Sequence, residues 1–160
     1  MNSPFVVTSG EPAGIGPDIC LSIATRKDNS DFVIFGNMDL LNQRAAILGL
    51  DLSFIEYQPT TEQSKLGNNE LFVSNFDLNQ ECLAGSLNKK NSPYVVEMIE
   101  SAIQACLRGE FKGCITAPVS KEIIADTGFN FKGHTEFLGH LCGKKPLMFF
   151  VSETMKVALA

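Results

Sequence analysis

The sequence predicts an α/β fold in which helices are layered against a mostly parallel β-sheet. Two observations support this prediction: short, continuously apolar segments recur along the chain, and helix-like segments and glycine-rich turns alternate with them. Strands that are apolar throughout are typical of a parallel sheet covered on both faces. Regular alternation of strands and helices is typical of layered α/β proteins. At 160 residues, the chain is long enough for one domain.

Each predicted strand is a short apolar run bounded by turn or loop residues, which distinguishes it from the longer helical segments. The predicted strands lie at residues 5–8, 32–35, 52–55, 71–73, 114–116, 147–151 and 156–160. Between the third and fourth strands, residues 58–69 are polar and rich in turn formers, so they are predicted to be a loop.

Helices are predicted where start and stop signals flank a segment with helical spacing. They lie at residues 17–26, 37–48, 93–108 and 120–126, with a further short helix beginning near residue 134. Pro17 suits a first helical position, Asn37 and Ser92 are typical N-caps, and Gly49 and Gly128 are stop signals. In the segment at 93–108, apolar residues recur every three or four positions, which predicts one buried face.

The last predicted strand, at residues 156–160, has the composition of a core strand. Such a strand normally leads into a surface loop, and a natural terminus seldom lies within one. We therefore expect residues 1–160 to be the N-terminal portion of a longer protein.

Composition and charge exclude several functional classes. The net charge is −5 and the sequence has no run of lysine or arginine, which argues against nucleic acid or an anionic membrane surface as partner. No segment has the length of an apolar membrane span or the pattern of a secretory signal. The 5 cysteines are widely spaced and odd in number, which predicts reduced thiols in the cytoplasm.

The turn at residues 9–16 has only part of a dinucleotide-binding fingerprint. Gly14 and Gly16 fit its first two glycines, but the third position is occupied by Ile19, and no acidic residue follows the second strand directly. We therefore interpret the turn as one that packs a helix onto the sheet and not as an NAD site. Three polar side chains could still lie at the edge of a cleft there: Ser9, Glu11 and Asp18.

The most informative segment surrounds His134, one of only 2 histidines in the chain. Histidine exchanges a proton near neutral pH, and the start of a helix can bind an anion through free N–H groups. Gly133 permits close approach of a ligand, and the Thr135 hydroxyl can act as a helix cap or as a donor. Two readings remain open at this point: a seat for a small anionic substrate such as a phosphate ester, or a half-exposed turn with Thr135 as N-cap.

Lys121 lies in a predicted loop that follows the strand at 114–116. Its ammonium could pair with a substrate carboxylate or phosphate, or it could be a solvated surface lysine, which is the more common situation. By contrast, Glu136 is interpreted as a first-turn acid and His140 as a surface residue. The spacing of histidines, cysteines and carboxylates predicts no metal site within this chain, and it gives no nucleophilic triad.

Three segments, at residues 8–18, 116–121 and 133–137, resemble motifs of the 4-hydroxythreonine-4-phosphate dehydrogenases of vitamin B6 biosynthesis, in the same order and at similar separations. The resemblance implies a three-layer α/β/α architecture similar to that of isocitrate and isopropylmalate dehydrogenases. It also implies NAD-dependent oxidation and decarboxylation of 4-phosphohydroxy-L-threonine by a homodimer, with a divalent metal (Zn, Mg or Co). It assigns substrate contacts to His134 and Thr135, to which we add Lys121.

The same resemblance covers about the first half of such an enzyme. It implies that the metal-binding histidines and the main NAD contacts lie beyond Ala160, so these residues alone should be inactive. Alternative functions are a related dehydrogenase acting on 4-phosphothreonate or cyclic diols, a phosphate acyltransferase with a similar cleft, and a non-catalytic fragment.

Overall fold

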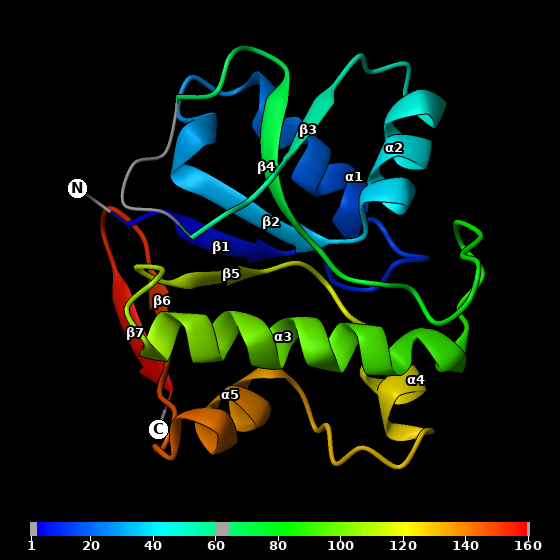
Figure 1. Cartoon of the computed structure of the whole chain (residues 1–160). Coiled ribbons are helices and arrows are strands. Elements are labelled where there is room, and N and C mark those ends of the chain that lie inside the picture. Colours follow the sequence, from blue (N-terminus) through cyan, green and yellow to red (C-terminus); the bar gives the residue numbers. More distant parts are fainter. Residues whose placement is uncertain (1–2, 60–64, 160) are drawn as a thin grey trace.

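The computed structural model describes residues 3–59 and 65–159, and its centre is a five-stranded sheet (Figure 1). The strands are β1 (Phe5–Thr8), β2 (Phe32–Gly36), β3 (Ser53–Glu56), β4 (Glu70–Asn75) and β5 (Cys114–Thr116). Their spatial order is β3-β4-β2-β1-β5, and every neighbouring pair is parallel, which confirms the predicted parallel sheet. In the predicted polar loop, residues 60–64 lie outside the described residues.

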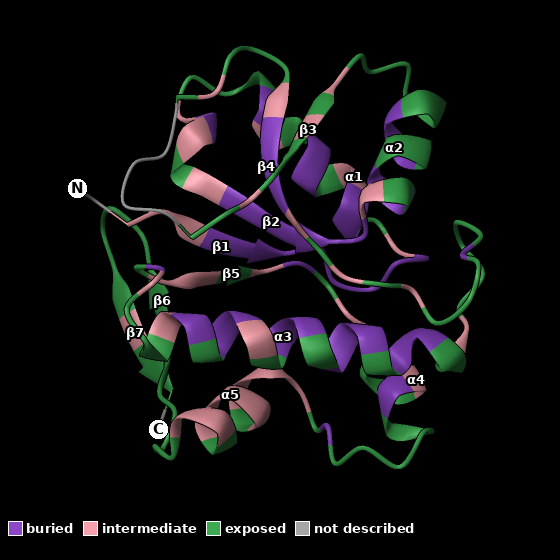
Figure 2. Cartoon of the chain, viewed as in Figure 1, coloured by how far each residue is buried: buried purple, intermediate pink, exposed green. Residues whose placement is uncertain are grey.

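Helices cover both faces of this sheet and complete three layers (Figures 1 and 2). They are α1 (Gly16–Leu21), α2 (Met38–Ile47), α3 (Ser92–Leu107), α4 (Lys121–Ala125) and α5 (His134–Cys142). Successive side chains of a strand point to opposite faces. Accordingly, Val6 and Val33 belong to the core cluster with α3, while Val7 and Ile34 belong to the cluster with α1 and α2. The predicted α/β/α arrangement is therefore confirmed.

The long helix α3 buries one face, as its apolar spacing predicts, but it begins one residue earlier than expected. Ser92 is not the N-cap, because it already has helical φ and ψ angles of −59° and −39° and is the first residue of the helix. A short 3₁₀ helix, Lys89–Asn91, runs directly into α3 and makes Asn91 the cap residue. The Ser92 hydroxyl instead donates to the carbonyl of Ile123, 3.3 Å away, and ties α3 to α4.

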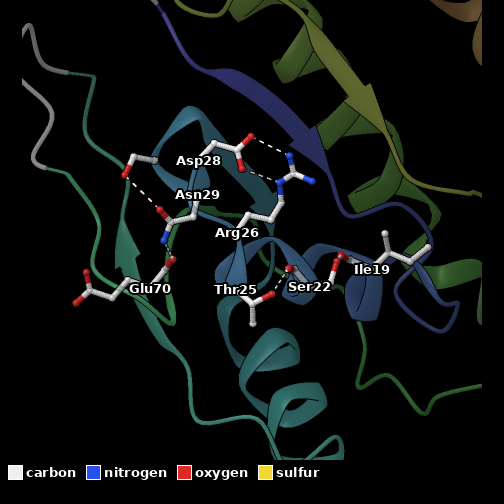
Figure 3. Close-up of polar contacts among 8 residues, drawn as sticks. Ile19, Ser22, Thr25, Arg26, Asp28, Asn29 and Glu70 are labelled. Atoms are coloured by element: carbon white, nitrogen blue, oxygen red, sulfur yellow. Dashed lines mark hydrogen bonds and ion pairs between the residues drawn. The ribbon is translucent and has the colours of Figure 1, made fainter. Parts of the chain in front are cut away.

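The predicted helix at 17–26 is shorter in the structure, because α1 passes into a 3₁₀ helix at Ser22–Thr25. Ser22 Oγ donates to the carbonyl of Ile19 at 2.6 Å, and Thr25 Oγ1 donates to that of Ser22 at 3.0 Å (Figure 3). Hydroxyls that bond to backbone carbonyls in this way compete with regular helical bonding and tighten the last turn.

A further set of polar contacts fixes the segment between this turn and β2 (Figure 3). Arg26 donates to both oxygens of Asp28, at 2.7 and 2.8 Å. The buried Asn29 amide donates to the carbonyls of Gly67 at 2.8 Å and Glu70 at 3.1 Å, which connects the segment to the start of β4. A buried amide satisfied by two backbone carbonyls holds this connection in place.

The turn after β1 packs directly against the loop after β5. A Cβ on Gly16 would lie 2.0 Å from the carbonyl oxygen of Ser9 and 3.1 Å from the Ala117 Cβ. A Cβ on Gly10, which has a φ of +73°, would lie 2.3 Å from the carbonyl oxygen of Pro118. The prediction that the glycines pack a helix onto the sheet is confirmed, and Gly16 has the tighter environment of the two glycines in the Gly14-x-Gly16 sequence.

The last part of the described chain forms a separate antiparallel hairpin, β6 (Met148–Val151) with β7 (Lys156–Leu159), beside the C-terminal end of α3 (Figure 1). The two strands are confirmed, but the expectation that residues 156–160 form a core strand is wrong for the residues described. Lys156, Ala158 and Leu159 are exposed, because no other described element covers them, and Ala160 lies outside the described residues.

We predict that Gly16→Ala destabilises the fold by about 3 kcal/mol, the upper end of the usual range for overpacking, because the new methyl group meets backbone that cannot move aside. Urea unfolding measured by circular dichroism would test this. Gly67→Ala is the matched control, since its nearest atoms belong to the flexible Glu70 side chain. Equal stability of the two variants would contradict the proposed packing role.

Candidate substrate site

Helix α5 begins at His134, and Gly133 precedes it as the cap residue. Gly133 has φ 148° and ψ 173°, a conformation found almost only in glycine. The first intrahelical bond runs from the Phe137 N–H to the Gly133 carbonyl at 3.2 Å. The N–H groups of the preceding three residues therefore point out of the helix start, as the anion-seat interpretation requires.

The interpretation of Thr135 as N-cap is wrong, because Thr135 is the second residue of the helix and no side chain caps α5. Among the hydrogen bonds between described residues, none involves the Thr135 hydroxyl. That hydroxyl is thus able to donate or accept a bond to a ligand at the helix start.

His134 is half-buried, and its ring lies edge-on to Phe131 with the ring centroids 5.9 Å apart. Phe131 is itself buried and contacts Phe137, which anchors this arrangement to the core. Burial lowers the pKa of His134, so the imidazole is neutral at neutral pH. Its Nε2 is buried and has no hydrogen-bond partner among the described residues. A buried, unsatisfied nitrogen is costly, which makes His134 suited to bonding a polar group that the described residues do not supply.

The charge around α5 is mixed. Glu136 lies in the first turn, and its Oε2 is 3.4 Å from the position that a Cβ on Gly133 would occupy. A carboxylate there disfavours a phosphate directly on the helix start. A nearby hollow of about 350 Å³ is lined by Glu100, Asn130, Lys132, Glu136, Phe137 and His140. Neither His134 nor Thr135 lines it, so this hollow is distinct from the predicted substrate contacts.

Lys121 is exposed at the start of α4, where the Ser120 hydroxyl accepts the Ile123 N–H at 3.5 Å. The helices α4 and α5 pack against different parts of α3, near its N-terminal and C-terminal halves respectively (Figure 1). No hydrogen bond or hollow of the described residues joins Lys121 to His134. Whether Lys121 contacts the same substrate as His134 and Thr135 stays a prediction.

The three polar side chains that could have edged a cleft are engaged within the fold. Ser9 Oγ lies 3.1 Å from the Tyr94 hydroxyl, and that hydroxyl accepts the Asn37 N–H at 3.1 Å. Burial raises the pKa of Tyr94 to about 12, so the hydroxyl stays protonated. Glu11 is buried and accepts the Ala13 N–H at 3.2 Å, while Asp18 forms a two-point ion pair with Arg44.

The turn after β1 and the loop after β5 are in contact at the position where α/β proteins commonly bind ligands. Strand order reverses between β1 and β5, and ligands generally bind outside the carboxyl ends of strands at such a point. In this chain, the Glu11 N–H donates to the Pro118 carbonyl at 3.0 Å, and Gly10 and Gly16 bring the backbones of the two loops close together.

Sequence reasoning missed a wide hollow of about 800 Å³ beyond the ends of β2 and β4. It lies between the first turn of α2 and a polar loop, and its lining includes Asp39, Gln43, Asp77 and Glu81. The sequence feature that could have indicated this hollow is the run of amide and carboxylate side chains after β2 and β4. The same pattern is equally common in solvated loops.

Two further observations concern metals and membranes. Within the described residues, no group of three or more histidine, cysteine, aspartate or glutamate side chains could hold a metal ion, and the residues present do not fit one. The five cysteines are free thiols. No helix in the described part of the chain is long and apolar enough to cross a membrane.

The fold is that of a class of metabolic dehydrogenases. The chain aligns over 98% of its length with 50% of a 4-hydroxythreonine-4-phosphate dehydrogenase from Klebsiella pneumoniae, with a TM-score of 0.87 and 25% identity. It also aligns with a terephthalate 1,2-cis-dihydrodiol dehydrogenase from Burkholderia xenovorans, with a TM-score of 0.75, 17% identity, and 99% and 47% coverage.

The comparison of sequences identifies one family within this class of dehydrogenases. Residues 28–160 match the family model described as pyridoxal phosphate biosynthetic protein PdxA, and the chain belongs to that family. A curated 4-hydroxythreonine-4-phosphate dehydrogenase from Marinobacter nauticus is 39% identical over 162 residues, covering 99% of this chain and 48% of the relative. The chain thus spans about half the length of the curated relatives it matches.

We predict that Glu11→Gln stabilises the protein more at pH 7.5 than at pH 4. Burial raises the pKa of Glu11 above the ordinary value of 4.5, so the native state binds the proton more tightly than the unfolded chain. That contribution to stability is complete below the ordinary value and is lost as pH rises through the raised pKa. Glutamine can keep the bond from Ala13 without this loss.

Unfolding free energies of Glu11→Gln and of the wild type at both pH values would test this. Glu97→Gln, at an exposed position of α3, is the control. A gain that is the same at pH 4 and pH 7.5 would show that Glu11 is not penalised for its charge.

Proposed function

We propose that the chain forms the N-terminal portion, residues 1–160, of a two-domain dehydrogenase. The whole enzyme would oxidise 4-phosphohydroxy-L-threonine with NAD and decarboxylate the product in pyridoxal phosphate biosynthesis. The observation that carries this proposal is the 39% identity to a dehydrogenase of that name across 99% of the chain. Family membership favours an oxidoreductase over the phosphate acyltransferase alternative.

In this proposal, His134 and Thr135 bind the substrate at the start of α5. The neutral imidazole can give or take one hydrogen bond to a substrate hydroxyl, and the Thr135 hydroxyl and free N–H groups can bind a second oxygen. Lys121 would supply a positive charge for the phosphate, which the Glu136 carboxylate disfavours beside His134. Since α4 and α5 lie apart along α3, the substrate would have to extend between them (Figure 1).

The proposal places NAD and a divalent metal in the part of the enzyme beyond Ala160, as the resemblance to the family implies. A homodimer and a cytoplasmic location complete the proposal, and the free thiols are consistent with a reducing compartment. A dehydrogenase acting on 4-phosphothreonate or a cyclic diol is the second candidate, since the fold is shared with a dihydrodiol dehydrogenase.

We predict that the protein purified from its source cells reduces NAD when 4-phosphohydroxy-L-threonine and a divalent metal are added. The absorbance of NADH reports the rate, and intact mass reports the length of the polypeptide. We expect kcat/KM for this substrate to exceed that for 4-phosphothreonate or a cis-dihydrodiol at least roughly tenfold, the effect of one lost hydrogen bond. Preference for another of the three would reassign the substrate, and no turnover with any would support a non-catalytic fragment.

We predict that His134→Ala in the full-length enzyme raises the Michaelis constant roughly tenfold, the usual effect of losing one hydrogen bond to a buried group. The far-ultraviolet circular dichroism should not change. His140→Ala is the matched control, because this second histidine is exposed in the same helix and does not contact the proposed substrate position. Unchanged kinetics in His134→Ala would remove His134 from the site.

A further inference from the structure

Three of the cysteines lie in neighbouring elements at one end of the molecule. Cys106 is in the last turn of α3, Cys114 is the first residue of β5, and Cys142 is the last residue of α5. Each is a half-buried free thiol, and each packs against the core cluster that contains α3. Figure 1 shows that α3 and α5 end on the same side of the molecule, which brings their two terminal cysteines to the same region.

The spacing of residues along the two helices places Cys106 and Cys142 in the contact between them. Residues four positions apart lie on the same face of a helix. Cys106 follows the buried Ala102 at this spacing, and Cys142 follows Leu138, which packs against the same core cluster. Since α3 packs against α5, both thiols lie at the C-terminal end of that contact.

The electrostatic interactions of these thiols are a second sign that they are close together. Burial raises the pKa of Cys106, and the charge of a Cys142 thiolate raises that pKa further. Burial raises the pKa of Cys114 to about 12, and the charge of a Cys106 thiolate adds to the effect. Because interactions between charges weaken with distance, Cys106 must lie near both of the other thiols.

This arrangement suits a disulfide better than a metal ion. Within the described part of the chain, no group of three or more histidine, cysteine, aspartate or glutamate side chains could hold a metal. A thiol reacts through its thiolate, and a pKa of about 12 leaves Cys114 almost no thiolate at neutral pH. The cysteines on the two helices therefore remain as the pair to be joined. In a reducing compartment, such a bond is usually transient and sensitive to oxidants.

We propose that Cys106 and Cys142 form a reversible disulfide on exposure to hydrogen peroxide, which ties the end of α5 to the end of α3. Cys142 attacks one peroxide oxygen, the O–O bond breaks, and a sulfenic acid and one water result. Cys106 then attacks the sulfenic sulfur, the S–S bond forms, and the hydroxyl leaves with the Cys106 proton as a second water. Two thiols are thus oxidised to one disulfide, and one peroxide is reduced to two waters.

The bond would close a loop that contains every proposed substrate contact. Lys121, His134 and Thr135 all lie between Cys106 and Cys142 in the sequence. A cross-link restricts the conformations of the segment that it closes, so oxidation would act on the substrate site. This consequence rests on the proposed function, whereas formation of the bond does not.

Peptide mapping of the full-length protein by mass spectrometry, after treatment with hydrogen peroxide, tests the proposal. We expect a pair of peptides joined through Cys106 and Cys142, lighter than the two free peptides by two hydrogen atoms, which separates after reduction with dithiothreitol. A bond between other cysteines, a bond between two molecules, or oxidation to sulfinic acid without any bond would overturn the proposal. Recovery of both thiols unchanged would also overturn it.

Substitutions in the full-length protein test which thiols form the bond. Cys142→Ser should abolish the joined peptides, and Cys106→Ser should do the same. Cys114→Ser is the matched control, because this third thiol packs against the same core cluster but is not part of the proposed pair. It should leave the bond intact. Loss of the bond in Cys114→Ser, with unchanged far-ultraviolet circular dichroism, would contradict the assignment.

NADH formation measured on the same samples separates this proposal from the proposed function. The Michaelis constant should rise after oxidation, because a cross-linked loop adapts less to substrate, and it should return after reduction. In Cys142→Ser it should not change. The disulfide in a protein without dehydrogenase activity would support the bond and reject the enzyme function, and dehydrogenase activity without the disulfide would do the reverse.

Discussion

The contact between the turn after β1 and the loop after β5 is the constraint on which the rest of the structure depends. There is no room for a side chain on Gly16 or Gly10, so the backbones themselves are in contact. Ser9 and Glu11, both in the turn after β1, are buried. The contact lies at the carboxyl ends of β1 and β5, where an α/β sheet would usually bind a ligand.

Much of the fold could be predicted because its signals are local. The apolar runs of β1 and β2, the Asn37 cap, whose side chain accepts the Leu40 N–H at 2.9 Å, and the apolar face of α3 all act within a few residues. The predictions were wrong where the structure of a residue depends on a neighbouring segment. The 3₁₀ turn before α3 makes Ser92 the first residue of the helix, and β7 is exposed because, apart from its partner strand β6, no described element covers it.

The candidate site was harder to predict, because it depends on distances that the sequence does not contain. The sequence singled out His134 and Thr135 by residue type, and the structure gives both an environment suited to ligand contact: a buried, unsatisfied Nε2 and an uncapped helix start. It could not show that α4 and α5 pack on different parts of α3. The unfavourable position of Glu136 and the hollow beyond β2 and β4 also emerge only in three dimensions.

The position of β1 inside the sheet has a consequence for how the protein is made. Of the strands in this sheet, β1 is synthesised before the others and can pair with β2 soon afterwards. Its other edge, which includes Val6, stays unpaired until Cys114 and the rest of β5 have been made. Contacts between residues so distant in the chain form slowly, and an unpaired strand edge invites pairing with other chains. Until β5 has been synthesised, the nascent chain thus exposes the unpaired edge of a central strand, and this is the interval in which a chaperone would be of most use.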